Sequence, residues 1–400
     1  MKISFKKAGS YLSFFILCLV YSPVWAQFIN LSDQASISIL TPEPGQESIE
    51  TIYGHSAIRV NDPGIDLDIV FDYGLFDFDD PNFALNFAKG YLNYSVGSRP
   101  YEYFIRGYMA NNRTIHEQVM NLNQNEIQDT FEYLATNALP ENKYYYYDYF
   151  YDNCATRIRD VFMEVLGEKL QFDENYVTPK HSFRQMVDSL SIYQPWGEFG
   201  IDICLGLPMD KKMSPMEYMF LPGYVYQAFQ SATILRGGNR EPAIKSEFIS
   251  FQASPQSFDK GTFTPKTVFW LLFIVTILIS YAGYKKDRNF FGYDLLLLSV
   301  FGLIGLLLTA LWAFTDHNAA ANNLNILWAM PTHLVGVIFL IRKHKPPFVR
   351  YYFLTIGIIM GLVLITWPIN PQGYNPAFFP IVASLGFRSG YIFMRLKAKK

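Results

Sequence analysis

The stretch FYDNCATRIRDVFMEVL, residues 150–166, joins a cysteine to the start of a helix. Asp152 and Asn153 are residue types that cap helix N-termini, and apolar residues then recur at helical spacing up to Gly167. This spacing predicts an amphipathic helix that begins at or beside Cys154. A thiol in that place meets the positive end of the helix macrodipole and unpaired backbone N–H groups, which favour a nucleophilic thiolate. A small buried residue in a first helical turn is the alternative reading.

The composition indicates a chain with a water-soluble part and a membrane part. Its 400 residues are 50% hydrophobic and 17% aromatic, yet the mean hydropathy is only +0.08. The formal net charge is -2 and no long basic run occurs, so the sequence gives no support for nucleic-acid binding. Three cysteines, Cys18, Cys154 and Cys204, are too few for a disulfide framework. A single bridge between the last two would remove the nucleophile.

Residues 1–26 have the pattern of a secretory signal peptide. A basic start with Lys2, Lys6 and Lys7 precedes the apolar run YLSFFILCLVY and a small-residue cleavage site before Gln27. We therefore expect the mature chain to begin near Gln27 and to be exported. An uncleaved membrane anchor is the alternative.

Residues 27–236 are polar, rich in aromatic residues and long enough for one globular domain that mixes strands and helices. Two runs in it, GHSAIRV (54–60) and DLDIVFDYGLF (66–76), alternate apolar and polar residues on either side of the turn NDPGI. They predict an antiparallel hairpin. A helix over 123–139 is predicted from its asparagine cap and the glutamate three residues later.

The predicted hairpin brings a histidine to a carboxylate. If the apolar residues share one face, Ile58 pairs with Ile69, and His55 then lies opposite Asp72. An imidazole within reach of Cys154 could take its proton, and a carboxylate would fix the tautomer. The alternatives are a structural histidine and an exposed strand carboxylate. The register also puts His55 on the polar face of the strands, whereas the Cys154 helix must pack on an apolar face.

Other catalytic patterns are missing from the sequence. His55, His116, His181 and Cys154 lack zinc-type spacing, with no HExxH and no CxxC, so we predict neither a metal site nor a cofactor. No GxSxG elbow offers a serine nucleophile. The glycines of GLIGLLL lie in an apolar run and are typical of packed membrane helices rather than of a phosphate-binding loop.

Long apolar runs replace the polar pattern near the end of the chain. Residues 237–264 are predicted to form a polar juxtamembrane connector, and residues 265–400 a transmembrane domain. The apolar runs predict five transmembrane helices, over about 266–284, 292–314, 324–341, 351–368 and 377–394.

Basic residues predict the orientation of these spans. Lys and Arg follow the first, third and fifth spans, whereas the loops TDHNAAANN and INPQGYNP have none. By the positive-inside rule the C-terminus is cytoplasmic, and the two loops face the side to which a signal peptide exports the domain. We therefore expect a multi-pass protein of a bacterial inner membrane with its N-terminal domain in the periplasm.

Two polar features belong to the predicted membrane part. Asp316, His317 and Asn318 lie at the outer mouth of the second and third spans, where they either help to place a lipid headgroup or are ordinary loop residues. Arg388 lies inside the fifth span and either contacts a phosphate or snorkels to the interface.

Several segments resemble the Bacteroidota-type lipoprotein N-acyltransferase family, in order along nearly the whole mature chain. The resemblance implies an α+β, circularly permuted papain-like thiol domain, similar to lecithin:retinol acyltransferase, followed by an all-α bundle of five transmembrane helices. The family's histidine matches His55 and its cysteine matches Cys154, whereas Asp72 comes from the hairpin register alone. The segments are YGHSAIRV, FDYGLFDFDDPNF, DNCATRIRD, SFRQMVD, LGLPMDK, MFLPGY and TDHNAAANNLNILWAMP.

The resemblance implies acyl transfer in two steps between partners held in the lipid bilayer. Cys154, with His55 as general base, would take an acyl chain from a membrane phospholipid and pass it from a thioester to the α-amino group of a diacylated lipoprotein N-terminus. The expected oxyanion donors are the Cys154 backbone N–H and either Asn153 or a nearby tyrosine. Two alternatives stay open: a membrane-tethered papain-like peptidase or amidase acting on cell-wall peptides, and a membrane scaffold without catalysis.

Overall fold

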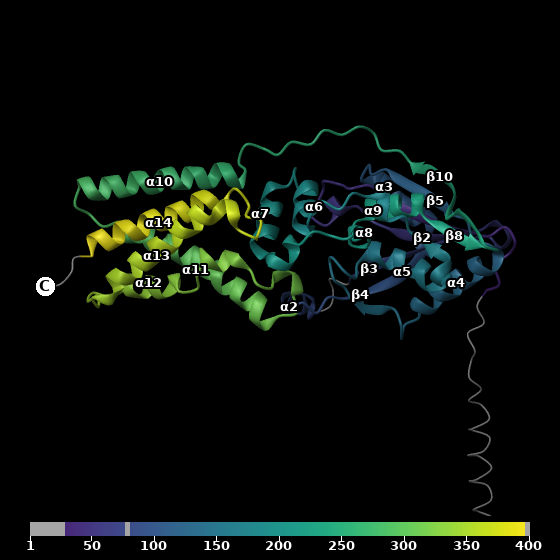
Figure 1. The fold of residues 1–400 in the computed structure, drawn as a ribbon, viewed down its shortest axis with the longest axis horizontal. Coiled ribbons are helices and arrows are strands. Elements are labelled where there is room, and N and C mark those ends of the chain that lie inside the picture. Colours follow the sequence, from purple (N-terminus) through teal and green to yellow (C-terminus); the bar gives the residue numbers. More distant parts are fainter. Residues whose placement is uncertain (1–28, 77–80, 397–400) are drawn as a thin grey trace, which may run out of the picture.

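The computed structural model describes residues 29–76 and 81–396. They form a sheet-rich α+β domain and a helical bundle, which lie end to end along the long axis of the molecule (Figure 1). The segment predicted to be a signal peptide, residues 1–26, lies outside the described residues.

The larger sheet has seven antiparallel strands in the order β10-β5-β1-β2-β3-β4-β6. The strands from β1 to β4 follow one another in space as they do in sequence, whereas β5 returns to the free side of β1. The sheet therefore brings the end of the predicted hairpin to its centre. The strands are β1 Ser36–Pro42, β2 Ala57–Asp62, β3 Leu67–Leu75, β4 Asn93–Pro100, β5 Ile115–Met120, β6 Tyr144–Tyr146 and β10 Ile244–Phe251.

A second, three-stranded sheet contains β7 Leu170–Gln171, β8 Thr233–Arg236 and β9 Asn239–Pro242. The segment predicted as a connector over 237–264 is therefore corrected in its first half, since β9 and β10 belong to the domain. The prediction missed them because strand pairing with distant partners, not a local pattern, orders these polar residues. The chain from 252 to 264 has no regular structure and runs along the outside of the molecule back to the bundle (Figure 1).

The hairpin of β2 and β3 forms as predicted, but its register differs by two residues. Ile58 pairs with Phe71, whereas apolar matching predicted Ile69. A shift of two keeps every side chain on its predicted face, because side chains alternate with period two. The shift arises because β2 continues to Asp62, whose carboxylate accepts the Gly64 N–H at 3.0 Å and so caps the turn between the strands.

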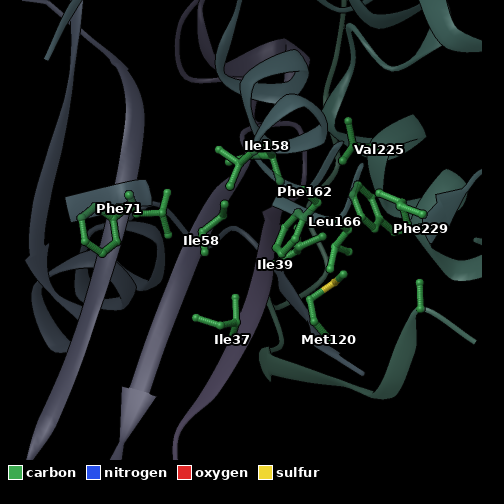
Figure 2. Close-up of a cluster of buried hydrophobic side chains, with 14 of the residues drawn as sticks. Ile37, Ile39, Ile58, Phe71, Met120, Ile158, Phe162, Leu166, Val225 and Phe229 are labelled. Carbon is green, nitrogen blue, oxygen red and sulfur yellow. The ribbon is translucent and has the colours of Figure 1, made fainter. Parts of the chain in front are cut away.

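Helices cover both faces of this sheet. On one face α5 packs together with α4 and α9, and its Ile158 and Phe162 lie against Ile39 and Ile58 of the strands (Figure 2). On the other face α3 buries Phe104. Full burial of each such side chain contributes roughly 1.5–3 kcal/mol, which holds α5 in one orientation. The helices of the domain are α2 Phe83–Lys89, α3 Tyr101–Ala110, α4 Gln124–Asn137, α5 Cys154–Leu166, α6 Phe183–Leu190, α7 Pro195–Cys204, α8 Pro215–Tyr218 and α9 Pro222–Ser231.

Three helices of the described C-terminal region are long and apolar enough to cross a membrane: Pro265–Lys285, Phe291–Phe314 and Phe348–Ile369. The other two of the five predicted spans stay a prediction. The predicted span over 324–341 contains only a nine-residue helix, whose length of about 14 Å is less than half of a hydrocarbon core. The predicted span over 377–394 buries Ser384, Arg388 and Ser389 among its neighbours. The helices are α10 Pro265–Lys285, α11 Phe291–Phe314, α12 His333–Ile341, α13 Phe348–Thr366 and α14 Phe378–Arg395.

The segment before α12 departs from a helix because it is fixed to the other domain. The side-chain amide of Asn323 donates to the Ile203 carbonyl at 2.7 Å, and that of Asn325 donates to the Asp202 carbonyl at 3.0 Å. Both carbonyls belong to α7, which lies between the sheet domain and the bundle (Figure 1). The two asparagines therefore hold the domain at one end of the bundle.

Candidate active site

Cys154 is the first residue of α5, as predicted, and Asn153 is its N-cap. The Asn153 side-chain oxygen accepts the N–H groups of Ala155 at 2.8 Å and Thr156 at 3.0 Å. The Thr156 hydroxyl in turn accepts the Asn153 N–H at 2.8 Å, which completes a capping box. The Cys154 N–H has no hydrogen-bond partner among residues 29–76 and 81–396. The helix start thus leaves one backbone donor beside the thiol.

His55 lies just before β2, two residues ahead of the first paired residue, Ala57. Gly54 precedes it with φ 79°, a left-handed conformation that glycine adopts without strain. The His55 N–H donates to the Pro42 carbonyl at 3.1 Å, and its side chain is 20% exposed. Its ring contacts Tyr108 and Asp72 on the side of α3, and because it lies beyond the paired part of β2 the charge of Cys154, at the start of α5, also acts on it.

Asp72 joins His55 to an arginine that sequence reasoning missed. His55 Nε2 lies 2.6 Å from Asp72 Oδ1, and the guanidinium of Arg99 on β4 contacts the other carboxylate oxygen. The Asp72 side chain is only 2% exposed, so the predicted pair is present and the exposed-carboxylate alternative is wrong. Asp72 faces Ala57 and Gly97 across the sheet, so both of its partners are diagonal neighbours.

The charges of this group favour an imidazolium. Burial acts to lower the pKa of His55, but the acidic groups of Tyr108, Cys154 and Asp72 together raise it well above its ordinary value. Burial acts to raise the pKa of Asp72, but His55 and Arg99 outweigh it and hold that pKa below its ordinary value. The ring of Tyr108 also stacks on His55, with centroids 6.4 Å apart. Because Asp72 engages Nε2, Nδ1 is the ring nitrogen left to exchange a proton with the thiol.

Gly74 lets the thiol approach the end of β3. It has φ 87° and lies at a bulge in the pairing of β3 with β4. A Cβ added to Gly74 would lie 3.7 Å from Cys154 Cβ and 3.3 Å from a ring carbon of Tyr147. A larger residue would therefore be strained by this φ and would press on the Tyr147 ring next to the nucleophile. A lone glycine inside a strand pattern is a sequence signal for such a bulge, and it was available in FDYGLF.

The hydroxyl of Tyr145 on β6 is a second donor without a partner. This oxygen is buried and makes no hydrogen bond within the described chain. It lies 4.0 Å from the position of a Gly74 Cβ, which is itself 3.7 Å from Cys154 Cβ. Burial, followed by the charge of the Cys154 thiolate, raises the pKa of Tyr145 far above its ordinary value. The phenol therefore keeps its proton and can donate it to a hydrogen bond.

The Asn153 side chain is fully used, so its predicted role as an oxyanion donor is corrected to that of a cap. Its two amide hydrogens go to the carbonyls of Tyr149 and Phe220, each at 2.8 Å. Tyr145 is the tyrosine that the aromatic run offers in its place.

The structure does not bring the predicted loop residues to the thiol. The Asp316 N–H donates to the Lys89 carbonyl at 2.9 Å, and His317 Nε2 lies 2.9 Å from the Phe87 carbonyl, so both hold α2 at the outer end of α11. Asn318 is exposed and starts the 3-10 turn that follows, its N–H donating to the Asp316 carbonyl at 2.9 Å. Their role toward a lipid headgroup stays a prediction.

Arg388 neither snorkels nor reaches a free phosphate. Its guanidinium forms a bidentate pair with Asp294 at 2.7 and 2.8 Å and donates to Ser280 at 2.8 Å. The arginine and the aspartate are each 2% exposed. Cys204 is a free thiol, as is Cys154, so the bridge that would remove the nucleophile is absent from the described chain.

A group of three carboxylates is the only described set of acidic, histidine and cysteine side chains close enough to hold a metal ion. Asp188, Glu198 and Asp202 place oxygen atoms within 4.8 Å of one another where α6 meets α7. Burial, then the neighbouring carboxylates, raises the pKa of Asp188 to about 8 and that of Glu198 to about 7. Asp202 is also paired with Arg184 at 3.1 Å. This arginine offsets part of the negative charge of the group.

Two family models match the chain. Residues 21–189 match the model described as the Lnb N-terminal periplasmic domain, and residues 257–400 match the Lnb transmembrane domain. The chain belongs to the Lnb family. These matches confirm the two-domain family indicated by the resemblance. No curated protein and no solved structure matches the chain.

As an Lnb family member, the chain is a membrane protein with a periplasmic N-terminal domain. His55, Asp72 and Cys154 all lie in the part that matches the Lnb periplasmic model, whereas Asp316 and His317 lie in the transmembrane part. The permuted papain-like order stays a prediction, since no solved structure matches.

Proposed function

We propose that this Lnb protein is a thiol acyltransferase of the inner membrane, with its C-terminus in the cytoplasm, that N-acylates lipoproteins. The acyl donor is a membrane phospholipid and the acceptor is the diacylglyceryl-cysteine N-terminus. The observation that carries the proposal is a thiol, Cys154, at a helix start, whose charge acts on a histidine that is paired with the buried Asp72. This group belongs to a domain that is fixed to a membrane bundle, which suits two substrates that live in the bilayer.

The first step forms a thioester. The Cys154 thiolate attacks the ester carbonyl of the phospholipid, and the charge on the carbonyl oxygen is stabilised by the Cys154 N–H and the Tyr145 hydroxyl. The C–O bond then breaks, and the departing oxygen takes the Nδ1 proton of His55, so that a lysophospholipid leaves. Asp72 keeps the imidazole oriented through Nε2.

The second step transfers the acyl group to nitrogen. The α-amine of the diacylglyceryl-cysteine attacks the thioester carbonyl, and the same two donors stabilise the oxyanion. The neutral imidazole of His55 accepts the amine proton, the C–S bond breaks, and the Cys154 thiolate returns. An amide forms, and the imidazolium–thiolate state is ready for another donor.

A thiol peptidase or amidase would use the same cysteine and histidine. The acyltransferase is favoured because the domain is tied to the bundle through α7, and α2 rests on the outer end of α11. A cell-wall peptide needs no such attachment to the bilayer.

Mass spectrometry of lipoprotein N-termini tests the proposal. Deletion of the gene is expected to leave diacylated termini, and wild-type protein, but not the Cys154→Ser variant, should restore the N-acyl chain. Unchanged triacylated termini in the deletion strain would overturn the proposal and favour the peptidase reading.

A further inference from the structure

Five aromatic side chains form a continuous row across the membrane-facing end of the periplasmic domain. Phe87 and Phe83 of α2 have ring centroids 6.1 Å apart, and Phe83 is 5.9 Å from Phe76 at the end of β3. Phe76 is 5.2 Å from Tyr94 of β4, which is 4.5 Å from Tyr147. We call these five residues the aromatic row.

One end of the aromatic row reaches the nucleophile. A ring carbon of Tyr147 lies 3.3 Å from the position of a Gly74 Cβ, and Cys154 Cβ lies 3.7 Å from that same position. The last ring of the row and the thiol therefore flank one glycine. This glycine has no side chain to separate them.

The other end of the aromatic row rests on the transmembrane bundle. The Phe87 carbonyl lies 2.9 Å from His317 Nε2, and the Lys89 carbonyl accepts the Asp316 N–H at 2.9 Å. These contacts fix α2 to the outer end of α11, whose last residue, Phe314, is 81% exposed. Figure 1 shows α2 beside this end of α11, between the bundle and the sheet. The row is thus continuous with a lipid-facing helix.

The surface at the α2 end of the aromatic row is apolar and exposed, whereas Tyr94, near the thiol, is only 7% exposed. Leu85 is 54% exposed, Phe87 42%, Phe76 40% and Tyr91 47%. Exposed apolar side chains gathered at one end of a domain usually mark a site that a partner covers. At the depth of a span end, the medium that meets these side chains is the outer leaflet, and its hydrocarbon is the complementary ligand.

We propose that the aromatic row holds a fatty acyl chain of the donor phospholipid and guides its ester from the outer leaflet to Cys154. The inference rests on the proposed function, since it names the path of that reaction's first substrate. Aromatic faces accept an aliphatic chain in many positions, so the row suits chains of different length. Phe76 and Phe87 act by binding, and neither exchanges a proton.

Acylation of Cys154 from two donors tests the row without any lipoprotein acceptor. The full chain is placed in nanodiscs of palmitoyl phosphatidylethanolamine, and the acyl-enzyme is measured by intact mass; p-nitrophenyl acetate serves as a soluble, short-chain donor. We expect the double variant Leu85→Ser, Phe87→Ser to lower the ratio of phospholipid rate to acetate rate at least tenfold. Phe248→Ser, a matched change at a 49% exposed ring on β10, should keep this ratio within twofold.

A spin label at position 85 tests the position of α2 independently of activity. Leu85→Cys is labelled in a Cys154→Ser, Cys204→Ser background, and collision with oxygen and with a soluble nickel chelate is compared with a label at position 248. Oxygen access at 85 and nickel access at 248 are expected. A water-exposed label at 85, or dipolar coupling between labels of two copies, would overturn the proposal.

The outcomes separate the two ideas. An unchanged ratio in the α2 variant, with wild-type acylation intact, rejects the aromatic row and leaves the proposed function standing. A wild-type protein that never acquires a palmitoyl group on Cys154 rejects the proposed function. The proposed role of the aromatic row is then rejected as well.

Discussion

Asp294 in the bundle and Asp72 in the periplasmic domain are two of the buried carboxylates that pair with basic groups, and they differ in what they leave open. In the bundle, Asp294 takes two hydrogen bonds from Arg388, whose third nitrogen donates to Ser280. In the periplasmic domain, Asp72 contacts His55 and Arg99, and the imidazole keeps one nitrogen for other partners. The first group is closed, whereas the second is open toward Cys154.

Two hydrogen-bond donors near the open group have no partner within the described chain. The Cys154 N–H and the Tyr145 hydroxyl make no hydrogen bond among the described residues. The Tyr145 hydroxyl is buried, and a buried donor without a partner costs about 1–3 kcal/mol, which a role in the reaction would explain. The closed pair of Asp294 and Arg388, together with Ser280, joins α10, α11 and α14.

Removal of the thiol should have the largest effect on acyl transfer. We expect Cys154→Ser to lower the rate of acyl-enzyme formation about a thousandfold or more, because a serine hydroxyl is a poor nucleophile without a matched base. The thermal midpoint should stay within about 2 °C, since the residue is only partly buried and serine is close to cysteine in size. Cys204→Ser is the matched control and should retain activity. Substantial transfer by Cys154→Ser would place the nucleophile elsewhere.

Loss of the Asp72 carboxylate should be the next largest effect. Asp72→Asn is expected to lower the rate about a hundredfold or more, because the amide no longer fixes the imidazole or stabilises its charged form. Proton transfer from His55 to the departing oxygen needs the imidazolium, which is lost as pH rises through the pKa of His55. Asp72 helps to raise that pKa, so the variant's alkaline limb should move to lower pH.

A pH–rate profile of acyl-enzyme formation measures this shift. Asp68→Asn is the control, since Asp68 lies on the same strand and pairs with Arg59 at 2.7 Å outside the site. If the rate falls at the same alkaline pH in wild type and in Asp72→Asn, the role of Asp72 toward His55 is rejected.

Local signals allowed the sequence to predict the helix start and the pair. Asn153 and Thr156 are neighbours along the chain, so the capping box could be read directly. The pair of His55 and Asp72 was predicted in spite of a register error of two residues, because a histidine reaches a diagonal carboxylate as well as an opposite one.

Distant contacts decide the features that the sequence did not predict. Arg99 meets Asp72 only because β4 pairs with β3, and Tyr145 joins the site only through β6 at the edge of the sheet. The predicted span over 324–341 is shortened because Asn323 binds a carbonyl of α7, 120 residues earlier in the chain. Hydropathy cannot contain such information, since it averages over neighbours in sequence.

Loss of the Tyr145 hydroxyl should have a smaller effect. Tyr145→Phe is expected to lower the rate roughly tenfold to a hundredfold, because one oxyanion donor is removed while the Cys154 N–H stays. It should not reduce stability, since the hydroxyl has no hydrogen-bond partner to lose within the described chain. Tyr146→Phe, at a neighbouring ring that is 73% exposed, is the control. A wild-type rate in Tyr145→Phe would remove this residue from the oxyanion site.

The closed pair in the bundle should have the smallest effect on chemistry and a large one on stability. Arg388→Met leaves Asp294 buried without its partner, which typically costs about 3–5 kcal/mol, so the thermal midpoint in detergent should fall. The double variant Arg388→Met, Asp294→Leu removes both charges and should recover most of that loss. Acylation of Cys154 by the folded fraction should stay within about twofold of wild type in both variants, because the pair takes no part in the reaction. A large loss of rate in the stable double variant would show that the bundle's charges act on the site, and the contrast between an open and a closed carboxylate would then fail.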